Sequence, residues 1–174
     1  EGGTNIGGFF EGMTYASLWN LPVIFIIENN LYAMGTPLYR AQPTRDLTAK
    51  AKAFNMASHR IDALDVELVY ETVNKAVVHA RSGQGPTLIE MITYRFRGHS
   101  MSDPAKYRPA GELEEMKEKD PLDTTRARLV DQGVTQAQMD ELDLRIAATV
   151  EDAVQFAEAS PELSYEEMQK LVFA

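Results

Sequence analysis

The sequence contains no cysteine, and it lacks an excess of basic residues. The absence of cysteine excludes disulfide bonds and thiolate metal sites. The 17 Lys and Arg residues stand against 26 Asp and Glu residues, which gives a formal net charge of -9. Because non-specific binding to nucleic acid requires a basic face, this balance argues against a nucleic-acid partner.

Long hydrophobic runs are also absent. The longest run, residues 21–27, is far shorter than the roughly 20 apolar residues that span a bilayer. The first residues show no basic stretch followed by an apolar one, which a secretory signal would require. We therefore expect a soluble intracellular protein with no membrane partner.

The chain opens on turn residues, Glu1-Gly2-Gly3-Thr4-Asn5, with no element before them. Domains rarely begin inside a glycine turn. We therefore expect a piece of a longer protein, whose first half is missing or lies on another chain. The 174 residues are still enough for one compact domain with its own core.

Helices and strands are predicted to alternate up to about residue 94. This alternation predicts an α/β fold with a parallel sheet and flanking helices. The first strand, 23–27, is uniformly apolar, which is typical of a strand buried on both faces. Residues 33–45 contain Gly35, Pro37 and Pro43 and are expected to be irregular. The other predicted elements are helices at 5–19, 46–54 and 66–82 and strands at 58–62 and 87–94.

Capping residues and apolar spacing give these helices further detail. Thr4 or Asn5 is expected to cap the first helix, and Asp65 to cap the helix 66–82. The residues of helix 66–82 that are expected to face the sheet are Leu68, Val69, Val73, Ala76 and Val77.

After residue 110 the pattern becomes helical and polar. We therefore divide the chain into an α/β portion, 1–110, and a helical tail, 111–174. The tail packs on the same domain or on a partner subunit, and the sequence favours neither. An ion pair is expected between Glu115 and Lys119, four residues apart. The predicted tail helices are 111–119, 121–132, 135–158 and 164–171, the last three with cap residues at Asp120, Thr135 and Ser164.

Three segments are expected to meet at one edge of the sheet, namely residues 1–5, 28–32 and 95–108. Open α/β sheets bind ligands at the carboxyl ends of their strands. The loop 98–108 follows a strand directly and is rich in polar and charged residues. It therefore indicates a site for an anionic ligand.

The first two of these segments have the residues of a phosphate and metal site. Gly2 and Gly3 allow close approach of a ligand to the backbone before a helix, although an ordinary tight turn explains them equally well. Glu1, Asn30 and the carbonyl of Tyr32 offer three hard oxygen ligands, half of what Mg²⁺ takes. The competing interpretation of Asn30 is a turn that ends the strand.

His99 is the residue of the loop with acid–base chemistry. It is expected to donate to a phosphate or to shuttle a proton, and the competing interpretation is a surface histidine. His59 and His79 stand without neighbouring motif residues, so we assign both to structure.

Residues 1–36 and 87–108 together resemble the alpha subunits of thiamine-diphosphate-dependent pyruvate dehydrogenase. The cofactor motif of that superfamily runs Gly-Asp-Gly and then, about 25–30 residues later, Asn-Asn. In this chain it corresponds to Glu1-Gly2 and Glu28-Asn29-Asn30. The loop Tyr94-Arg95-Phe96-Arg97-Gly98-His99-Ser100-Met101-Ser102-Asp103-Pro104 is similar to the second hallmark of the family. The resemblance implies a thiamine diphosphate-binding fold that is truncated at the N-terminus.

The resemblance also implies roles for individual residues. Gly2, Gly3 and Asn5 would lie on the diphosphate side of the cofactor. Asn30 and the Tyr32 carbonyl would hold Mg²⁺ together with Glu1. His99 would contact the diphosphate and support the later transfer to lipoamide.

The function implied is the oxidative decarboxylation of pyruvate with acetyl transfer to lipoamide. The implied partners are a beta subunit, in an alpha2beta2 heterotetramer, and the lipoyl domain of a dihydrolipoyl acetyltransferase. The implied location is the bacterial cytoplasm, with the mitochondrial matrix or a plastid as alternatives. Two other interpretations stay open, namely the alpha subunit of another 2-oxo acid or acetoin dehydrogenase, and a non-catalytic fragment that only assembles with partner chains.

Two departures from the family affect the site. Position 1 is Glu where the family has Asp, and the additional methylene moves the carboxylate by roughly 1 Å. The alpha subunits of the family have a further half before this motif, with another catalytic histidine, and their activating glutamate lies on the beta subunit. This chain alone is therefore not expected to form a complete thiamine site.

Overall fold

The computed structural model describes residues 1–172. The chain divides into two compact units, Glu1–Arg126 and a second unit that begins at Ala127. The first unit contains the sheet and all the candidate site residues.

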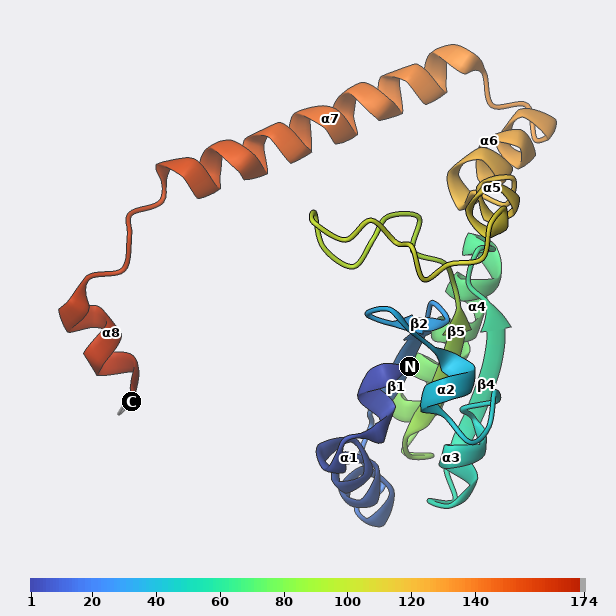
Figure 1. Cartoon of the computed structure of the whole chain (residues 1–174), viewed down its shortest axis with the longest axis vertical. Coiled ribbons are helices and arrows are strands. Elements are labelled where there is room, and N and C mark those ends of the chain that lie inside the picture. The colour runs from blue at the N-terminus through green and yellow to red at the C-terminus, as the bar shows by residue number, and fades with distance from the viewer. Residues whose placement is uncertain (173–174) are drawn as a thin grey trace. The chain divides into compact units, whose positions relative to one another are not determined.

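Three parallel strands form the main sheet, in the order β1 (Ile24–Asn29), β5 (Thr87–Ile92) and β4 (Ala57–Asp62) (Figure 1). Ile24 of β1 and Ala57 of β4 both align with Thr87, so the three strands run in register. The central strand β5 is buried from Thr87 to Met91, because it has a neighbour on each edge and helices on each face. The predicted parallel α/β sheet is therefore confirmed.

The two faces of the sheet belong to separate core clusters. Leu88 of β5 faces one side and Ile89 the other, as the two-residue period of a strand requires. One cluster involves α1 (Gly7–Leu18) and the short helices α2 (Leu38–Ala41) and α3 (Ala49–Lys52). Its buried members are Met13, Ile27, Leu38, Leu47, Ala51, Met56 and Leu88.

The other face is covered by α4 (Val66–Arg81), whose Ala76 packs against Ile89 and Met91. Asp65 caps α4, because its carboxylate accepts hydrogen bonds from the amides of Glu67 and Leu68 at 3.1 Å each. This confirms the predicted cap.

The prediction that Leu68 of α4 faces the sheet is wrong. Leu68 is 38% exposed, whereas Val69 and Val73 pack on the sheet and Thr72 is buried between them. The helical stripe that faces the sheet runs through 69, 72, 73 and 76, so Leu68 lies one position outside it.

The two outer strands differ in how their edges are protected. β4 carries His59 and Arg60 on its exposed positions, whereas β1 leaves Ile26 51% exposed. The expected burial of the first strand on both faces is therefore wrong, since only Ile27 and Asn29 of β1 are buried. Within the part of the chain that the structure describes, β1 pairs with β5 alone.

A carboxylate lies buried in the middle of this sheet. Glu90 of β5 is 0% exposed. It accepts hydrogen bonds from Asn29 Nδ2 at 2.7 Å and from the backbone amide of Leu47 at 3.0 Å, and it pairs with Arg60 Nε at 3.1 Å. Asn29 ends β1 and Arg60 belongs to β4, so one side chain connects all three strands.

The start of the chain differs from the expected helix 5–19. A 3₁₀ helix, η1 (Gly2–Asn5), precedes α1, and the N-cap position of α1 is Ile6, which provides no side-chain bond. The predicted cap by Thr4 or Asn5 is therefore wrong. Both side chains bond elsewhere, since Thr4 Oγ1 donates to the carbonyl of Glu1 at 2.7 Å and Asn5 Nδ2 to that of Ala41 at 2.8 Å.

Part of the expected irregular stretch is a small hairpin. β2 (Tyr32–Ala33) and β3 (Thr36–Pro37) pair antiparallel, and α2 follows directly. Leu31 and Met34, on either side of β2, have left-handed backbones with φ of 72° and 55°. Such conformations are costly for residues other than glycine, so tertiary contacts must maintain this turn.

The rest of the chain is helical, with α5 (Glu112–Lys117), α6 (Pro121–Asp131), α7 (Gln136–Ala159) and α8 (Tyr165–Val172). Thr135 forms a capping box with Gln138 at the start of α7, as predicted. The Glu115–Lys119 ion pair is also present at 3.1 Å. The division of the chain after residue 110 stays a prediction. In residues 1–172 no helix is both long and apolar enough to cross a membrane.

Removal of the Glu90 carboxylate is expected to destabilise the first unit strongly. Glu90→Ala leaves the buried Leu47 amide and the Asn29 amide group without their acceptor. We expect the free energy of unfolding to fall by about 3 kcal/mol, measured by urea denaturation. Glu71→Ala is the matched control, because it removes an exposed partner of Lys75 at 3.6 Å. It should change the free energy by less than about 0.5 kcal/mol, and a similar small loss for Glu90→Ala would contradict the role assigned to Glu90.

Candidate functional site

The carboxyl edge of the sheet brings the first two candidate segments together. Glu1 Oε2 accepts a hydrogen bond from the backbone amide of Asn30 at 3.1 Å. The amino group of Glu1 lies 3.4 Å from the carbonyl oxygen of Glu28. Two residues that are 29 positions apart in the sequence are thus adjacent at the carboxyl edge of the sheet.

The two asparagines that end β1 have different surroundings. Asn29 is fully buried and donates to Glu90. Its Oδ1 accepts from the amide of Leu31 at 3.1 Å, whereas Oδ1 of Asn30 accepts from the amide of Tyr32 at 3.2 Å. Both side chains therefore stabilise the turn after β1, and Asn30 is the one that lines a hollow at the carboxyl ends of the strands.

The donor set is compatible with a hard cation. Glu1 and Asn30 each use one oxygen in the contacts above, and carboxylate and amide oxygens have further lone pairs. Within residues 1–172 no three His, Cys, Asp or Glu side chains are grouped as metal ligands. Any Mg²⁺ bound here would take its remaining oxygens from a backbone carbonyl, from water or from a phosphate.

The glycine turn has one crowded and one open position. A Cβ on Gly2 would lie 2.6 Å from Cβ of Ala33, so only glycine fits there without a shift of β2. A Cβ on Gly3 would meet nothing within 4 Å. The turn is therefore packed against the hairpin at Gly2 and accessible at Gly3.

Lys50, which is not among the predicted site residues, donates hydrogen bonds to this turn. Lys50 Nζ donates to the Thr4 carbonyl at 2.7 Å and to Asn5 Oδ1 at 3.1 Å. It lies 5.2 Å from the centre of the Phe10 ring, and burial lowers the pKa of its ammonium group. No sequence motif marks this contact, which spans about 46 residues between two unrelated segments. The Asn5 side chain is thus bonded within the protein.

The loop 95–108 is organised around Asp103. Its carboxylate accepts from the amide of His99 at 2.7 Å, from the amide of Ala105 at 2.8 Å and from the Tyr107 hydroxyl at 2.8 Å. These bonds, with the His99 amide first among them, lower the pKa of the Asp103 carboxyl. Gly98 lies against Asp103 so closely that no Cβ fits at this position. The fold of the loop therefore depends on the identities of Gly98 and Asp103.

Arg108 closes the loop onto its own beginning. Its guanidinium group donates to the carbonyls of Phe96 at 3.3 Å and Arg97 at 3.0 Å, and also to that of Arg95. The same group lies 4.8 Å from the centre of the Tyr94 ring. Arg108 is thus a structural cation here, since both terminal nitrogens of its guanidinium group donate to backbone carbonyls.

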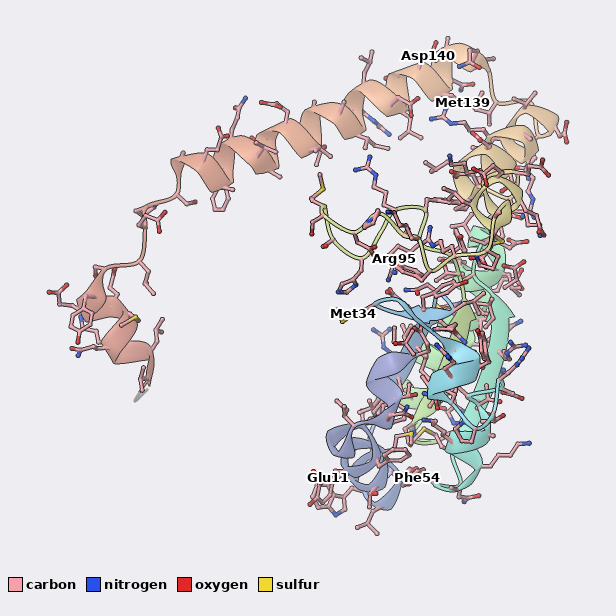
Figure 2. All side chains as sticks on the ribbon, in the orientation of Figure 1. Glu11, Met34, Phe54, Arg95, Met139 and Asp140 are labelled. Carbon is pink, nitrogen blue, oxygen red and sulfur yellow. The ribbon has the colours of Figure 1, made fainter. Side chains whose placement is uncertain are left out.

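Arg95 connects the loop to the hairpin. Its guanidinium donates to the Met34 carbonyl at 2.8 Å and to the Tyr107 hydroxyl at 2.9 Å (Figure 2). Tyr107 in turn packs against Gly35, where a Cβ would lie 2.9 Å from the ring. The Tyr107 ring also lies 5.4 Å from the Tyr32 ring, so the second and third candidate segments are adjacent, as expected.

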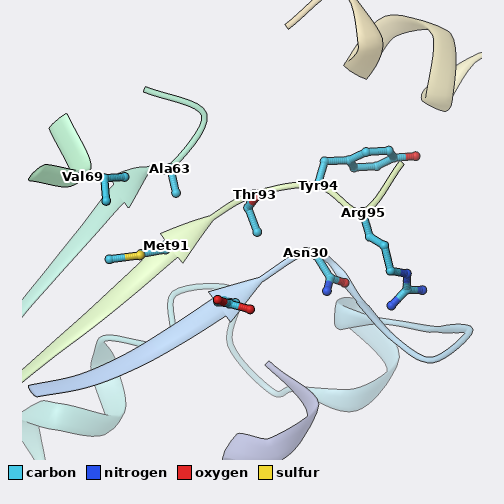
Figure 3. Close-up of a pocket in the computed structure, with 8 residues that line it drawn as sticks. Asn30, Ala63, Val69, Met91, Thr93, Tyr94 and Arg95 are labelled. Atoms are coloured by element: carbon cyan, nitrogen blue, oxygen red, sulfur yellow. The ribbon is translucent and has the colours of Figure 1, made fainter. Parts of the chain in front are cut away.

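A hollow of about 490 Å³ lies at the carboxyl ends of the strands. Asn30, Thr93, Tyr94 and Arg95 form its polar side, and Figure 3 shows Asn30 and Arg95 together on one side of it. The rest of the lining is Glu28 and three apolar residues, Ala63, Val69 and Met91.

Glu1 and His99 line different hollows. Glu1 and Gly3 border one of about 520 Å³ beside β1. His99 is exposed and borders another of about 500 Å³ together with Arg97, Ser100 and Met101. Hydrogen bonds thus join Glu1, Asn30 and Tyr32. His99 lies on a separate loop, which Arg95 connects to the hairpin through the Met34 carbonyl.

The chain matches a known protein family over nearly all of its length. The sequence profile of the family described as "Dehydrogenase E1 component" matches residues 1–166. The chain belongs to this family. Its match covers the sheet, the loop 95–108 and most of the helices.

Three similar proteins are each named as the alpha subunit of the pyruvate dehydrogenase E1 component. The chain is 42% identical over 170 residues to "Pyruvate dehydrogenase E1 component subunit alpha" of Rhizobium meliloti (strain 1021), a match that covers 97% of this chain and 49% of the relative. It is 43% identical over 169 residues to the protein of that name in Zymomonas mobilis, with 97% and 48% covered. A chloroplastic form from Arabidopsis thaliana is 39% identical over 175 residues, with 100% and 41% covered. The chain therefore spans about half the length of the curated relatives it matches.

The loop 95–108 is expected to lose its order when Asp103 is replaced. In Asp103→Ala the amides of His99 and Ala105 lose their common acceptor, so their hydrogen exchange should accelerate by about tenfold or more. Exchange measured by mass spectrometry or NMR tests this. Lys106→Ala, an exposed position of the same loop, should leave the exchange unchanged. Equal protection in Asp103→Ala and the parent would exclude Asp103 as the organising residue.

The same carboxyl predicts a pH dependence of the loop. Because the pKa of Asp103 is lowered in the folded chain, its contribution is complete above the ordinary value of 3.8 and is lost as the pH falls through the lowered value. Exchange protection factors of the loop should thus stay constant from neutral pH down to about pH 4. A loss of protection between about pH 7 and about pH 5 would contradict this.

Proposed function

We propose that this chain is the part of a pyruvate dehydrogenase alpha subunit that holds the diphosphate and the metal of thiamine diphosphate. The observation that carries the proposal is the contact between Glu1 and Asn30 at the carboxyl edge of a parallel sheet. Membership of the dehydrogenase E1 family and relatives named as pyruvate dehydrogenase alpha subunits support it. The reaction would be oxidative decarboxylation of pyruvate, with the acetyl group passed to lipoamide.

Thiamine diphosphate would supply the electron sink for decarboxylation, and the protein would bind and orient it. Gly2, Gly3 and His99 would contact its diphosphate. Asn5 would act from behind the turn, since Lys50 and Ala41 engage its side chain. Glu1, Asn30 and the Tyr32 carbonyl would hold Mg²⁺.

The proposed partners are a beta subunit, in an alpha2beta2 arrangement, and the lipoyl domain of the acetyltransferase. Because the chain spans about half of its relatives, the other walls of the site would come from additional polypeptide. The competing proposal, a non-catalytic piece that only assembles with partner chains, is favoured by one observation. The hollow bordered by His99 shares no residue with the hollow bordered by Glu1.

Calorimetric titration with thiamine diphosphate and Mg²⁺, with the partner chain present, separates these proposals. Saturable binding supports the cofactor site, and its absence leaves only the assembly role. Glu1→Asp restores the residue typical of the family, whose shorter side chain suits octahedral Mg²⁺ better. We expect it to tighten Mg²⁺ binding by about threefold or more, and an unaltered or weaker affinity counts against Glu1 as a ligand.

His99→Ala is expected to lower the reductive acetylation of lipoamide in the assembled complex by at least about tenfold, because a proton donor near the diphosphate is lost. The rate is measured with a free lipoyl domain as acceptor. His59→Ala, an exposed histidine on β4, is the control and should retain the parent rate. If His99→Ala has the parent rate as well, His99 has no part in the transfer.

A further inference from the structure

The first residue of α5 joins two tyrosines from opposite parts of the candidate site. Glu112 Oε2 accepts a hydrogen bond from the Tyr32 hydroxyl, and Oε1 accepts one from the Tyr94 hydroxyl, both at 2.9 Å. Tyr32 follows β1 and Tyr94 follows β5. The two oxygens of a single carboxylate thus bridge segments that are 62 positions apart, since the two bonds span 80 and 18 residues.

Each tyrosine connects Glu112 to a different component of the site. Tyr32 is 6% exposed, and its backbone forms the turn with Asn30. Tyr94 is 7% exposed and lies immediately before the loop 95–108, which carries His99. Burial fixes both rings, so a displacement of either segment would move a hydroxyl away from Glu112.

The surroundings of the Glu112 carboxylate favour both of its hydrogen bonds to the tyrosines. Burial, with the bond to Glu112 as the next cause, raises the pKa of both Tyr32 and Tyr94 to about 12. Both hydroxyls therefore stay protonated donors at neutral pH. The Arg108 guanidinium lies over the Tyr94 ring at 4.8 Å and the Tyr32 ring at 5.9 Å, which places a positive charge near the carboxylate.

We propose that Glu112 is a positioning residue that holds the metal-binding turn and the His99 loop in one fixed relation. This inference rests on the function proposed above. Glu112 itself contacts tyrosines and would touch neither cofactor nor substrate. Its role is to couple Tyr32, whose carbonyl would hold Mg²⁺, to the loop that carries His99.

The proposal is tested in the full-length protein assembled with its partner chain. Tyr32→Phe removes the link to the turn, Tyr94→Phe removes the link to the loop, and Glu112→Gln weakens both without changing the shape of the side chain. We expect Tyr32→Phe and Glu112→Gln each to raise the half-saturating concentration of Mg²⁺ and thiamine diphosphate by about tenfold. Tyr94→Phe and Glu112→Gln should each accelerate hydrogen exchange in 95–108.

Non-additivity separates coupling through Glu112 from independent contributions of Glu112 and Tyr32. In the Glu112→Gln background, Tyr32→Phe should cause a smaller further loss of cofactor affinity than it causes in the parent, because the bond it removes is already weakened. Glu115→Gln, on an exposed position of the same helix, is the control and should match the parent in affinity and exchange. Independent, additive effects of the two substitutions would overturn the coupling.

The failure of this inference is distinguishable from failure of the proposed function. If the parent assembly binds the cofactor and all three variants match it in affinity and loop exchange, Glu112 is not a positioning residue. If the parent itself does not bind the cofactor, the proposed function fails and this inference falls with it.

Discussion

The buried carboxylate of Glu90 is the constraint on which the rest of the structure depends. A charge at the centre of a three-stranded sheet is tolerated only when its partners are fixed. Those partners are Asn29 at the end of β1, the amide of Leu47 and Arg60 of β4. Glu90 therefore connects the end of β1 and the interior of β4 to the segment at Leu47.

The geometry of the candidate site follows from this arrangement. Asn29 is held inside by Glu90, so the next residue, Asn30, emerges at the carboxyl edge, where its amide meets Glu1. The left-handed backbone of Leu31 then turns the chain towards the hairpin, and the Tyr32 ring is directed back to Glu112. Hydrogen bonds thus connect residues from Glu90 in the interior of the sheet to Glu1 and Glu112 at its carboxyl edge.

Local patterns in the sequence were sufficient for the elements and for several of their ends. The apolar run before Asn29, the cap at Asp65 and the capping box at Thr135 all depend on residues within a few positions of one another. The family resemblance was carried by the residues of the cofactor motif and of the loop 94–104, and the convergence of Glu1 with Asn30 followed from the expected position of both at one edge of the sheet. The predicted cap at Thr4 was wrong because Gln42 and Lys50, which are distant in the sequence, donate to the Thr4 hydroxyl. Leu68 was assigned to the wrong face because it lies one position outside the stripe that packs on the sheet.

The residues that support the site were not predictable in this way. Lys50, Glu90 and Glu112 act on partners 18 to 80 positions away. A lysine or glutamate in a polar helix has the same local signature whether it is solvated or engaged. Only Glu90, a single charge within the apolar strand 87–92, stands out in the sequence, and even there nothing indicates Asn29 or Leu47 as its partner.

The unequal edges of the sheet have a practical meaning for anyone who handles the isolated chain. β4 has charged side chains at its border, which discourage the addition of another strand. β1 has an apolar border with Ile26 half-exposed, and such a border is a template for association between molecules. In isolation the chain is therefore expected to associate with other copies of itself through the exposed edge of β1.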